Sequence, residues 1–217
     1  PGPGGRLVPF IGRSDAVCKR ELYQLKAGKI GGWSSENQGQ AGPVQWNFSP
    51  SGLPYFGPFA QQSLTLKLTK LPPHRHVRLD MDALIIGSWD GNGRFGRGPD
   101  ILDIRVPGVG TALHSSFFNN TEGSGAHQQI QSFPQPFGMG FNEGYTGAAE
   151  TRTLGFVEPW AGEDFHRDAT YRLNYTFEHT GPTLELVITG QTVRQDGINT
   201  LWGDELWGLG SMTVKTD

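Results

Sequence analysis

The chain has 217 residues, a formal net charge of -3 and a pI near 6.1. This charge gives no basic surface for a nucleic acid backbone, and no Lys/Arg cluster suggests contact with a membrane surface. No apolar run approaches the roughly 20 residues that span a bilayer, so we expect neither nucleic acid binding nor membrane insertion. Cys18 is the one cysteine, which excludes an internal disulfide. We interpret it as a small buried side chain, with an intermolecular link as the alternative.

The 32 glycines and 15 prolines are typical of short strands joined by many turns and fit long helices badly. The 13 Phe, 6 Trp and 5 Tyr residues predict a core rich in aromatic side chains. No internal linker or repeat divides the chain, so we expect one domain over residues 14–217. Residues 1–13 begin Pro-Gly-Pro-Gly-Gly and are typical of a linker. A start at Pro1 rather than Met suggests a processed or trimmed product.

One helix is expected, over residues 14–28. Ser14 or Asp15 would cap its start, apolar side chains recur at helical spacing, and Gly28 would end it.

The centre of the chain, residues 63–106, carries the clearest strand pattern. Residues 64–68 alternate leucine with polar side chains, the period of a half-buried strand. Leu71-Pro72-Pro73 ends that strand because proline cannot donate to a β ladder. Residues 77–86 form the next strand, which runs into Ser-Trp-Asp-Gly-Asn.

Further strands are expected on both sides of this centre, at residues 31–33, 46–48, 53–59, 111–118, 128–133, 151–157, 171–177, 184–188 and 207–215. The alternating segments 171–177 and 184–188, joined by a turn, predict a hairpin. About ten short strands and one helix indicate an all-β fold, an antiparallel β-sandwich of jelly-roll type with one short N-terminal helix. A barrel is the alternative.

An acidic loop follows the central strand. Asp90, Asn92 and Asp100 lie within eleven positions of one another, separated by glycines. Calcium takes six to eight oxygen ligands, and a glycine-rich turn can supply them. The loop therefore predicts a calcium site. The alternative is a set of Asx turns with Arg94 and Arg97 as counter-charges.

Several short motifs resemble a group of extracellular β-sandwich modules of bacterial, protist and algal cell-surface and fibre proteins. They are Phe56-Gly57-Pro58-Phe59, Leu71-Pro72-Pro73-His74, Ser88-Trp89-Asp90-Gly91-Asn92, Gly98-Pro99-Asp100, Gln131-Ser132-Phe133-Pro134 and Asp204-Glu205-Leu206-Trp207-Gly208-Leu209. The resemblance covers about 70% of the chain, residues 56–209. It implies a secreted, laminin-G-like or jelly-roll sandwich that is combined with other modules in large surface or fibre proteins. It implies no catalytic activity.

The closing motif adds two candidate metal ligands. By the resemblance, Asp204 and Glu205 share a rim of the sandwich with the Asp90 loop. This sequence has Leu206 where the related modules commonly have serine, which weakens the metal role at that end. The alternative is that both acids accept hydrogen bonds from nearby turn amides.

Two other pairs have the spacing of known chemistry. His74 and His76 are two residues apart, as in some zinc sites, although His74 can equally bond a strand-end carbonyl. Asp80 and Asp82 would lie about 7 Å apart on one strand face, which is compatible with glycosidase carboxylates. Outward-facing aspartates beside Arg78 explain that pair equally well.

Two sets of residues connect the chain to glycans. Asn47, Asn119 and Asn174 occur in Asn-x-Ser/Thr patterns that mark N-glycosylation acceptors. We interpret Asn119 as the best acceptor and Asn174 as reachable on the outer side of a strand. Trp160 and Trp202, in loops rich in glycine and acid, are candidates for a sugar-stacking platform. The alternative is that most tryptophans fill the core.

These observations favour a non-enzymatic extracellular structural or adhesive module, stabilised by calcium and part of a larger surface or filamentous assembly. Its partners would be copies of itself or other surface and fibre proteins. A calcium-dependent carbohydrate-binding module is the first alternative. A glycoside-active enzyme that uses Asp80 or Asp82 is the second.

Overall fold

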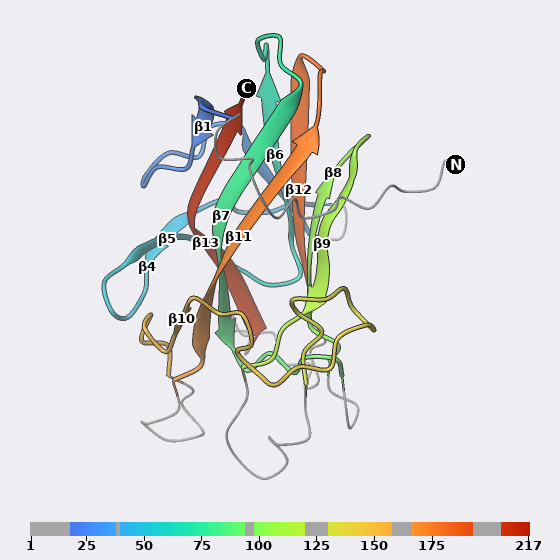
Figure 1. Ribbon diagram of the computed structural model, residues 1–217. Coiled ribbons are helices and arrows are strands. Elements are labelled where there is room, and N and C mark those ends of the chain that lie inside the picture. Colours follow the sequence, from blue (N-terminus) through green and yellow to red (C-terminus); the bar gives the residue numbers. More distant parts are fainter. Residues whose placement is uncertain (1–17, 38–39, 94–97, 120–129, 158–165, 193–204) are drawn as a thin grey trace.

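The computed structural model describes residues 18–37, 40–93, 98–119, 130–157, 166–192 and 205–217, and all their regular elements are β-strands (Figure 1). The strands are β1 Arg20–Gln24, β2 Trp33–Asn37, β3 Gln40–Ala41, β4 Trp46–Phe48, β5 Pro54–Phe59, β6 Ser63–Thr69, β7 His76–Gly87, β8 Ile101–Val106, β9 Gly110–Ser116, β10 Glu150–Thr151, β11 Asp168–Glu178, β12 Thr183–Gln191 and β13 Glu205–Thr216.

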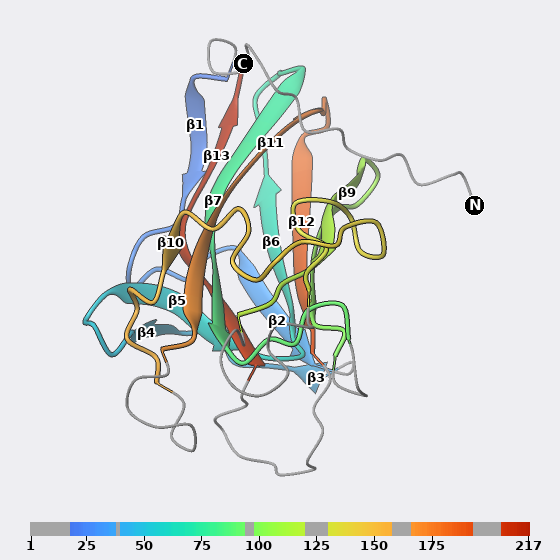
Figure 2. The same cartoon turned by 60° about the horizontal axis from the view of Figure 1, so that its bottom comes forward.

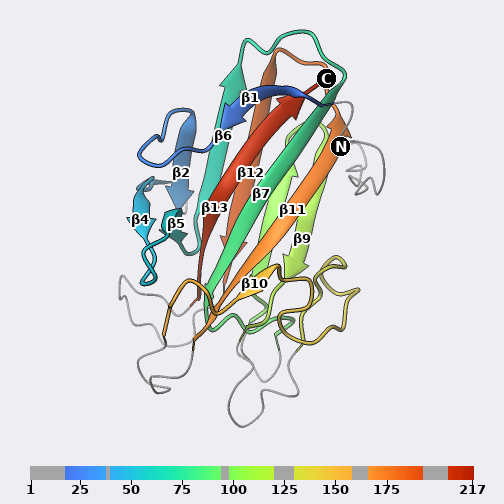
Figure 3. The ribbon, with the colours of Figure 1, turned by 60° about the vertical axis from the view of Figure 1, so that its left-hand side comes forward.

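The strands form two antiparallel sheets that pack face to face (Figures 1 and 3). The seven-stranded sheet has the order β10-β11-β7-β13-β5-β4, and β1 pairs with β13 beside this path. The six-stranded sheet has the order β3-β2-β6-β12-β8-β9. The described residues are therefore an all-β, antiparallel β-sandwich, as the sequence predicts.

The core lies between the two sheets and follows the period-two pattern of the central strands. In β7, Val77, Leu79 and Met81 point inward and join one large cluster of buried side chains. Their neighbours on β11 in that register, such as Tyr175 opposite Leu79, also point inward. A strand has one wet and one dry face because successive side chains alternate, and that alternation is what made these strands visible in the sequence.

A bulge in β13 keeps its apolar side chains on the inner face. The register with β7 shifts between Leu209 and Ser211, so Gly210 is the extra residue. Because of this shift, both Leu209 and Met212 are buried in the core, whereas Ser211 faces out.

A second, smaller cluster covers the outer face of the seven-stranded sheet near the end of β7. Leu84 and Ile86 are buried there beneath a segment that carries Leu154 and Phe156. Asp168, fully buried at the start of β11, holds this segment: its carboxylate accepts hydrogen bonds from the main-chain N–H groups of Leu154 (2.9 Å) and Phe156 (3.2 Å). The end of the sheet at which β7 stops is thereby dry on both faces.

The predicted helix is wrong where it can be compared. Residues 20–24 form β1, which pairs with the end of β13 from Arg20 opposite Thr216 to Gln24 opposite Thr213. Leu25 is buried against the core instead of ending a helical face. The available edge of β13 outweighs the helical spacing, because tertiary pairing overrides local propensity. Residues 14–17 and the expected linker, 1–13, lie outside the described residues.

The expected hairpin of residues 171–177 and 184–188 is also wrong. Both segments are strands, but β11 pairs with β7 and β12 pairs with β6 and β8. The turn between them carries the chain from one sheet to the other. Alternation identifies a strand but not its partner, and so cannot separate a hairpin from such a crossing.

Two other expected strands are shorter than the sequence predicts. Of residues 151–157, only Thr151 lies in a strand, β10, and Val157 makes an isolated bridge to His166. Of residues 128–133, Gln131 makes an isolated bridge to Asn142, and residues 128–129 lie outside the described part. Within that part of the chain, no helix is long and apolar enough to cross a membrane.

Candidate metal centre

Three buried carboxylates meet at one end of the sandwich, where β7 ends and β13 begins (Figure 2). Asp90 follows the end of β7, Asp100 immediately precedes β8, and Glu205 is the first residue of β13. One carboxylate oxygen from each lies within 4.8 Å of the others. Since β7 and β13 belong to one sheet and β8 to the other, the cluster joins the two layers.

The strand register explains why residues far apart in sequence meet here. Glu205 lies opposite Gly87, the last residue of β7, in the antiparallel ladder. The chain continues from Gly87 through a short segment to Asp90, which forms an isolated bridge to Phe118, two residues after the end of β9 in the other sheet. The ends of β7 and β13 therefore bring Asp90 and Glu205 to one place.

Two hydrogen bonds hold the ends of the segment between Asp90 and Asp100 together. The N–H of Asp90 donates to Oδ2 of Asp100 at 2.5 Å, and the N–H of Asp100 donates to the carbonyl of Gly91 at 3.0 Å. Gly91 has a φ of +67°, and a Cβ atom there would overlap the carbonyl oxygen of Ile130. Only glycine fits this approach of two backbone segments.

Electrostatics make this cluster costly unless a positive charge offsets it. All three residues are buried, and Asp100 has no exposed surface. Two ionised carboxylates 4.8 Å apart repel by about 3.5 kcal/mol at an effective dielectric constant of 20. A divalent cation among three such oxygens converts this repulsion into attraction.

The spacing and the chemistry of the oxygens fit calcium. Calcium binds oxygen ligands at about 2.4 Å, so two ligands on opposite sides of one ion are about 4.8 Å apart. The separation of the carboxylate oxygens, at most 4.8 Å, lies within that limit. Carboxylates, carbonyls and amides are the hard ligands that calcium prefers over softer nitrogen and sulfur sites.

The main chain of Asn119 lies beside the loop. Its main-chain N–H donates to the carbonyl of Trp89 at 3.3 Å, which places it next to Asp90. The side chain is 1% exposed, and its Oδ1 is buried without a hydrogen-bond partner in the described structure. A buried acceptor without a donor costs about 1–3 kcal/mol, and a bound cation is one way to satisfy it.

Asn92, a predicted ligand, has other partners. Its side-chain oxygen accepts hydrogen bonds from the hydroxyls of Ser116 and Ser132, and its amide nitrogen donates to the carbonyl of Gly140 at 3.0 Å. This asparagine therefore ties the loop to residues 132–140. Asp204, the remaining predicted ligand, lies outside the described residues, as do Arg94 and Arg97.

The sequence predicts the three carboxylates of the cluster but not the surroundings of Asn119 and Asp168. Asp90, Asp100 and Glu205 were predicted as ligands, and the structure brings them together. Asn119 was assigned to glycosylation, because nothing in the sequence indicates that the strand before it turns its side chain inward. Asp168, a buried anchor at the start of β11, is a residue that no motif in the sequence indicates.

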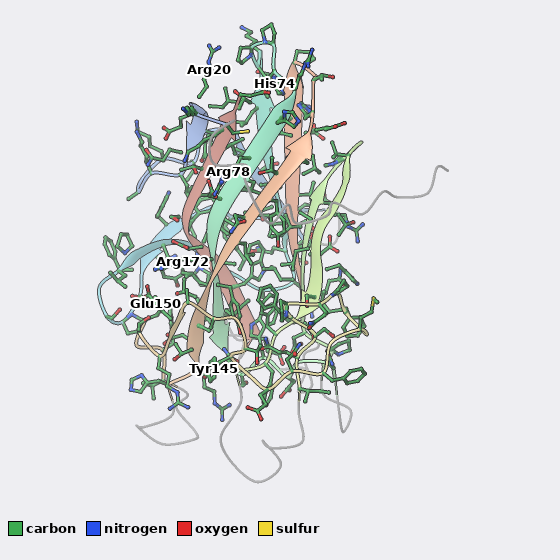
Figure 4. The ribbon with its side chains drawn as sticks, in the orientation of Figure 1. Arg20, His74, Arg78, Tyr145, Glu150 and Arg172 are labelled. Carbon is green, nitrogen blue, oxygen red and sulfur yellow. The ribbon has the colours of Figure 1, made fainter. Side chains whose placement is uncertain are left out.

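The aspartates considered for glycoside chemistry are engaged on the outer face of the seven-stranded sheet. Asp80 pairs with Arg78 at 2.8 Å, and Asp82 accepts a hydrogen bond from the hydroxyl of Ser211 at 2.7 Å. Arg172 lies 3.7 Å from Asp82 as well. Figure 4 shows Arg78 and Arg172 along this face. Both aspartates therefore lie on the outer face beside an arginine, as the alternative to glycosidase chemistry expects.

The histidine pair likewise has structural partners. Nδ1 of His74 lies 2.6 Å from the carbonyl of Pro72, the strand-end contact that the sequence suggested. Nδ1 of His76 instead lies 3.0 Å from Oδ2 of Asp217. Cys18 is buried and forms no disulfide, and its thiol donates to the carbonyl of His76 at 3.8 Å.

The residues assigned to glycans have different surroundings. Asn174 is exposed on the outer face of β11, as expected. Asn119 is buried, so a glycan cannot be attached to it in the folded chain, and the preference for Asn119 is corrected. Asn47 is half-buried, and its amide donates to the carbonyl of Gly57. Trp160 and Trp202 lie outside the described residues, so the sugar-stacking platform stays a prediction.

Comparisons with known proteins give only remote similarities. No family model matches the chain, and no curated protein matches it. Among solved structures, the C-terminal CBM6 of LamC, a marine laminarinase from Zobellia galactanivorans, is 8% identical with a TM-score of 0.36, over 90% of this chain and 93% of that one.

Two enzymes show similarity at the same level. An exo-β-1,3-galactanase from Phanerochaete chrysosporium is 8% identical with a TM-score of 0.35, over 90% of this chain and 29% of that one. The Agl-KA catalytic domain is 12% identical with a TM-score of 0.39, over 93% of this chain and 28% of that one. TM-scores below 0.5 carry no argument about function.

Proposed function

We propose that this chain is a non-enzymatic, extracellular structural module of jelly-roll type, stabilised by calcium, that works within a larger surface assembly. The observation that carries the proposal is the meeting of Asp90, Asp100 and Glu205 in a buried cluster that links the two sheets. Calcium is abundant outside cells, where weak sites of this kind are occupied. The resemblance of the Asp90 loop and the closing motif to surface modules supports the same assignment.

The cation has a mechanical role in this account. Its ligands come from the ends of β7 and β13 in one sheet and from the start of β8 in the other. Binding is linked to folding, because an ion that binds only the folded chain stabilises it by about 2.7 kcal/mol at 100 times its Kd. Calcium would thus lock the loop end of the sandwich without taking part in a reaction.

Thermal unfolding with calcium and with chelator tests the proposal. Calcium should raise the Tm of the unaltered chain by several degrees, given about 2 to 4 °C per kcal/mol for a chain of this size. Asp100→Asn removes one ligand charge and should abolish most of that rise. In chelator, the variant should be no less stable than the original, because it also removes repulsion.

Asp168→Asn is the matched control. Asp168 is another fully buried aspartate, but its oxygens accept main-chain N–H groups and it is not part of the cluster. This variant should lower the Tm equally in calcium and in chelator and keep the calcium-dependent rise. An unaltered chain whose Tm does not respond to calcium contradicts the proposal.

A further inference from the structure

One long strand edge of the seven-stranded sheet has no neighbour. β11 pairs with β7 along its whole length, from Asp168 to Glu178, but β10 covers only Ala169 and Thr170 on its other side. In the described part of the chain, residues 172–178 therefore have a partner on one side alone. Figure 3 shows this edge at the border of the sheet.

The main-chain groups at this edge alternate in a known direction. The carbonyls of Asp168 and Thr170 accept hydrogen bonds from Arg152 and Ala149, each at 2.8 Å, on the side away from β7. The N–H of His179 points the opposite way, to the carbonyl of Arg75. Because these groups alternate along a strand, the N–H and C=O groups of the even-numbered residues from 172 to 178 point away from β7, toward the open edge.

The side chains of the open segment are complementary to a second copy of it. An antiparallel pair centred on Tyr175 sets Arg172 opposite Glu178 of the other copy, and symmetry makes this contact twice. Asn174 then lies opposite Thr176, and every outward-directed main-chain group meets another even-numbered residue. A pair centred on Asn174 would instead set Glu178 opposite Thr170, whose carbonyl already accepts a hydrogen bond from Ala149.

We propose that β11 pairs with β11 of a second copy in this register and joins two seven-stranded sheets into one. Opposite charges directly across an antiparallel pair are favourable, and the two-fold arrangement closes on itself. On the inner side, Leu173, Tyr175 and Phe177 are already buried in the core cluster, so the pairing depends on main-chain hydrogen bonds and on the charged side chains of the outer face. The inference deepens the assembly part of the proposed function and uses no cation ligand.

Arg172 can make this contact while it keeps its present partners. Its guanidinium lies 2.6 Å from Glu150 and 3.7 Å from Asp82, and its side chain is 64% exposed. Figure 4 shows Arg172 and Glu150 near each other. A guanidinium has five N–H donors, so it can serve more than one carboxylate.

Charge reversal tests both the contact and its register. Sedimentation velocity is measured on chain prepared without glycans, because Asn174 lies in the paired segment, and in chelator, so that the result is independent of the calcium site. The unaltered chain should sediment as a dimer at about 100 µM. Arg172→Glu and Glu178→Arg should each sediment as monomers, because like charges then oppose each other at both ends. An equimolar mixture of the two variants should recover the dimer.

Two further variants keep the result interpretable. Lys67→Glu reverses an exposed charge that pairs with Glu185 at 2.7 Å on the other sheet, and this variant should stay dimeric. Thr176→Pro removes one outward N–H at an edge position, where proline is tolerated, and should give a folded monomer. A monomeric unaltered chain, dimers of the single charge variants, or a mixture that stays monomeric overturns the proposal.

Discussion

The indole N–H of Trp89 donates a hydrogen bond of 2.9 Å to the main-chain carbonyl of Leu206, and this contact ties together the neighbours of two acidic residues. Trp89 precedes Asp90, and Leu206 follows Glu205. Both partners are buried, Trp89 completely. The bond therefore holds the end of β7 against the start of β13 and fixes the position of two of the three carboxylates.

Trp89→Phe should weaken both the fold and cation binding. The ring stays, but the buried carbonyl of Leu206 loses its donor, which costs about 1–3 kcal/mol. Calcium affinity should fall because Asp90 and Glu205 are held less rigidly. Chemical denaturation and calcium titration measure the two effects. Trp33→Phe is the control, since it loses a comparable indole hydrogen bond to Tyr23 at 2.8 Å and should leave calcium affinity unchanged. An equal loss of affinity in both variants would argue against a local effect.

Gly190→Ala should destabilise the chain by about 1–3 kcal/mol, the range for an overfilled core. Gly190 lies in β12, and a Cβ atom there would overlap Nε1 of Trp207, which donates to the carbonyl of Ala60 at 2.8 Å. The indole would have to move and lose that bond. Gly31→Ala adds the same methyl where no atom lies within 4 Å and should change the free energy of unfolding little. Urea denaturation compares the two variants, and equal stabilities would show that β12 yields to the added methyl.

His179 should remain neutral at a pH where an ordinary histidine is protonated. Burial lowers the pKa of His179 below the usual 6.5, and electrostatic repulsion from the His74 ring lowers it further, while the hydrogen bond to Thr183 opposes the shift. Nε2 of His74 lies 2.8 Å from Nδ1 of His179. Nε2 of His179 faces the carbonyl of Thr183 at 3.1 Å and donates to it, so Nδ1 accepts from His74.

The sign of the pH dependence follows from this lowered pKa. As the pH falls through 6.5, the unfolded chain takes up a proton at His179 before the folded chain does, so the stability contributed by His179 decreases with acid. His179→Gln should show a smaller loss of stability between pH 7.5 and pH 5. NMR titration gives the pKa directly, and a value at or above 6.5 would contradict the argument.

Glycosylation should follow exposure in the folded chain. If the chain is secreted from a eukaryotic cell, Asn174, exposed on β11, should carry a glycan, and Asn119, 1% exposed, should not. Mass spectrometry of tryptic peptides measures occupancy at both sites. Asn174→Gln should lower the mass of the secreted protein by one glycan, whereas Asn119→Gln should leave its mass pattern unchanged. A glycan found on Asn119 of folded protein would contradict its buried position.

The sequence predicts where strands lie in the chain better than it predicts which strands pair with each other. Alternation reveals β6 and β7, because each buries one face of leucine, valine or methionine against the core. It does not reveal that β11 and β12 belong to different sheets, since both sides of the connecting turn have the same period. Residues 20–24 have helical spacing, and only the edge of β13 makes them a strand.

The candidate site was predicted in the same uneven way. Asp90 and Asp100 are close in sequence, so a single loop brings them together. Glu205 is more than 100 residues away in the sequence. Only the resemblance to surface modules identifies it as a candidate ligand, because no strand pattern places it near Asp90. The amide oxygen of Asn92 accepts hydrogen bonds from Ser116, the last residue of β9, and from Ser132. The sequence does not show that these two hydroxyl donors lie beside the loop.

Crystals grown with calcium test the central claim most directly, through an anomalous difference map at the loop end of the sandwich. A single peak about 2.4 Å from carboxylate oxygens of Asp90, Asp100 and Glu205 is the expected result. A map in which a guanidinium group or water alone lies among those oxygens at millimolar calcium would contradict it.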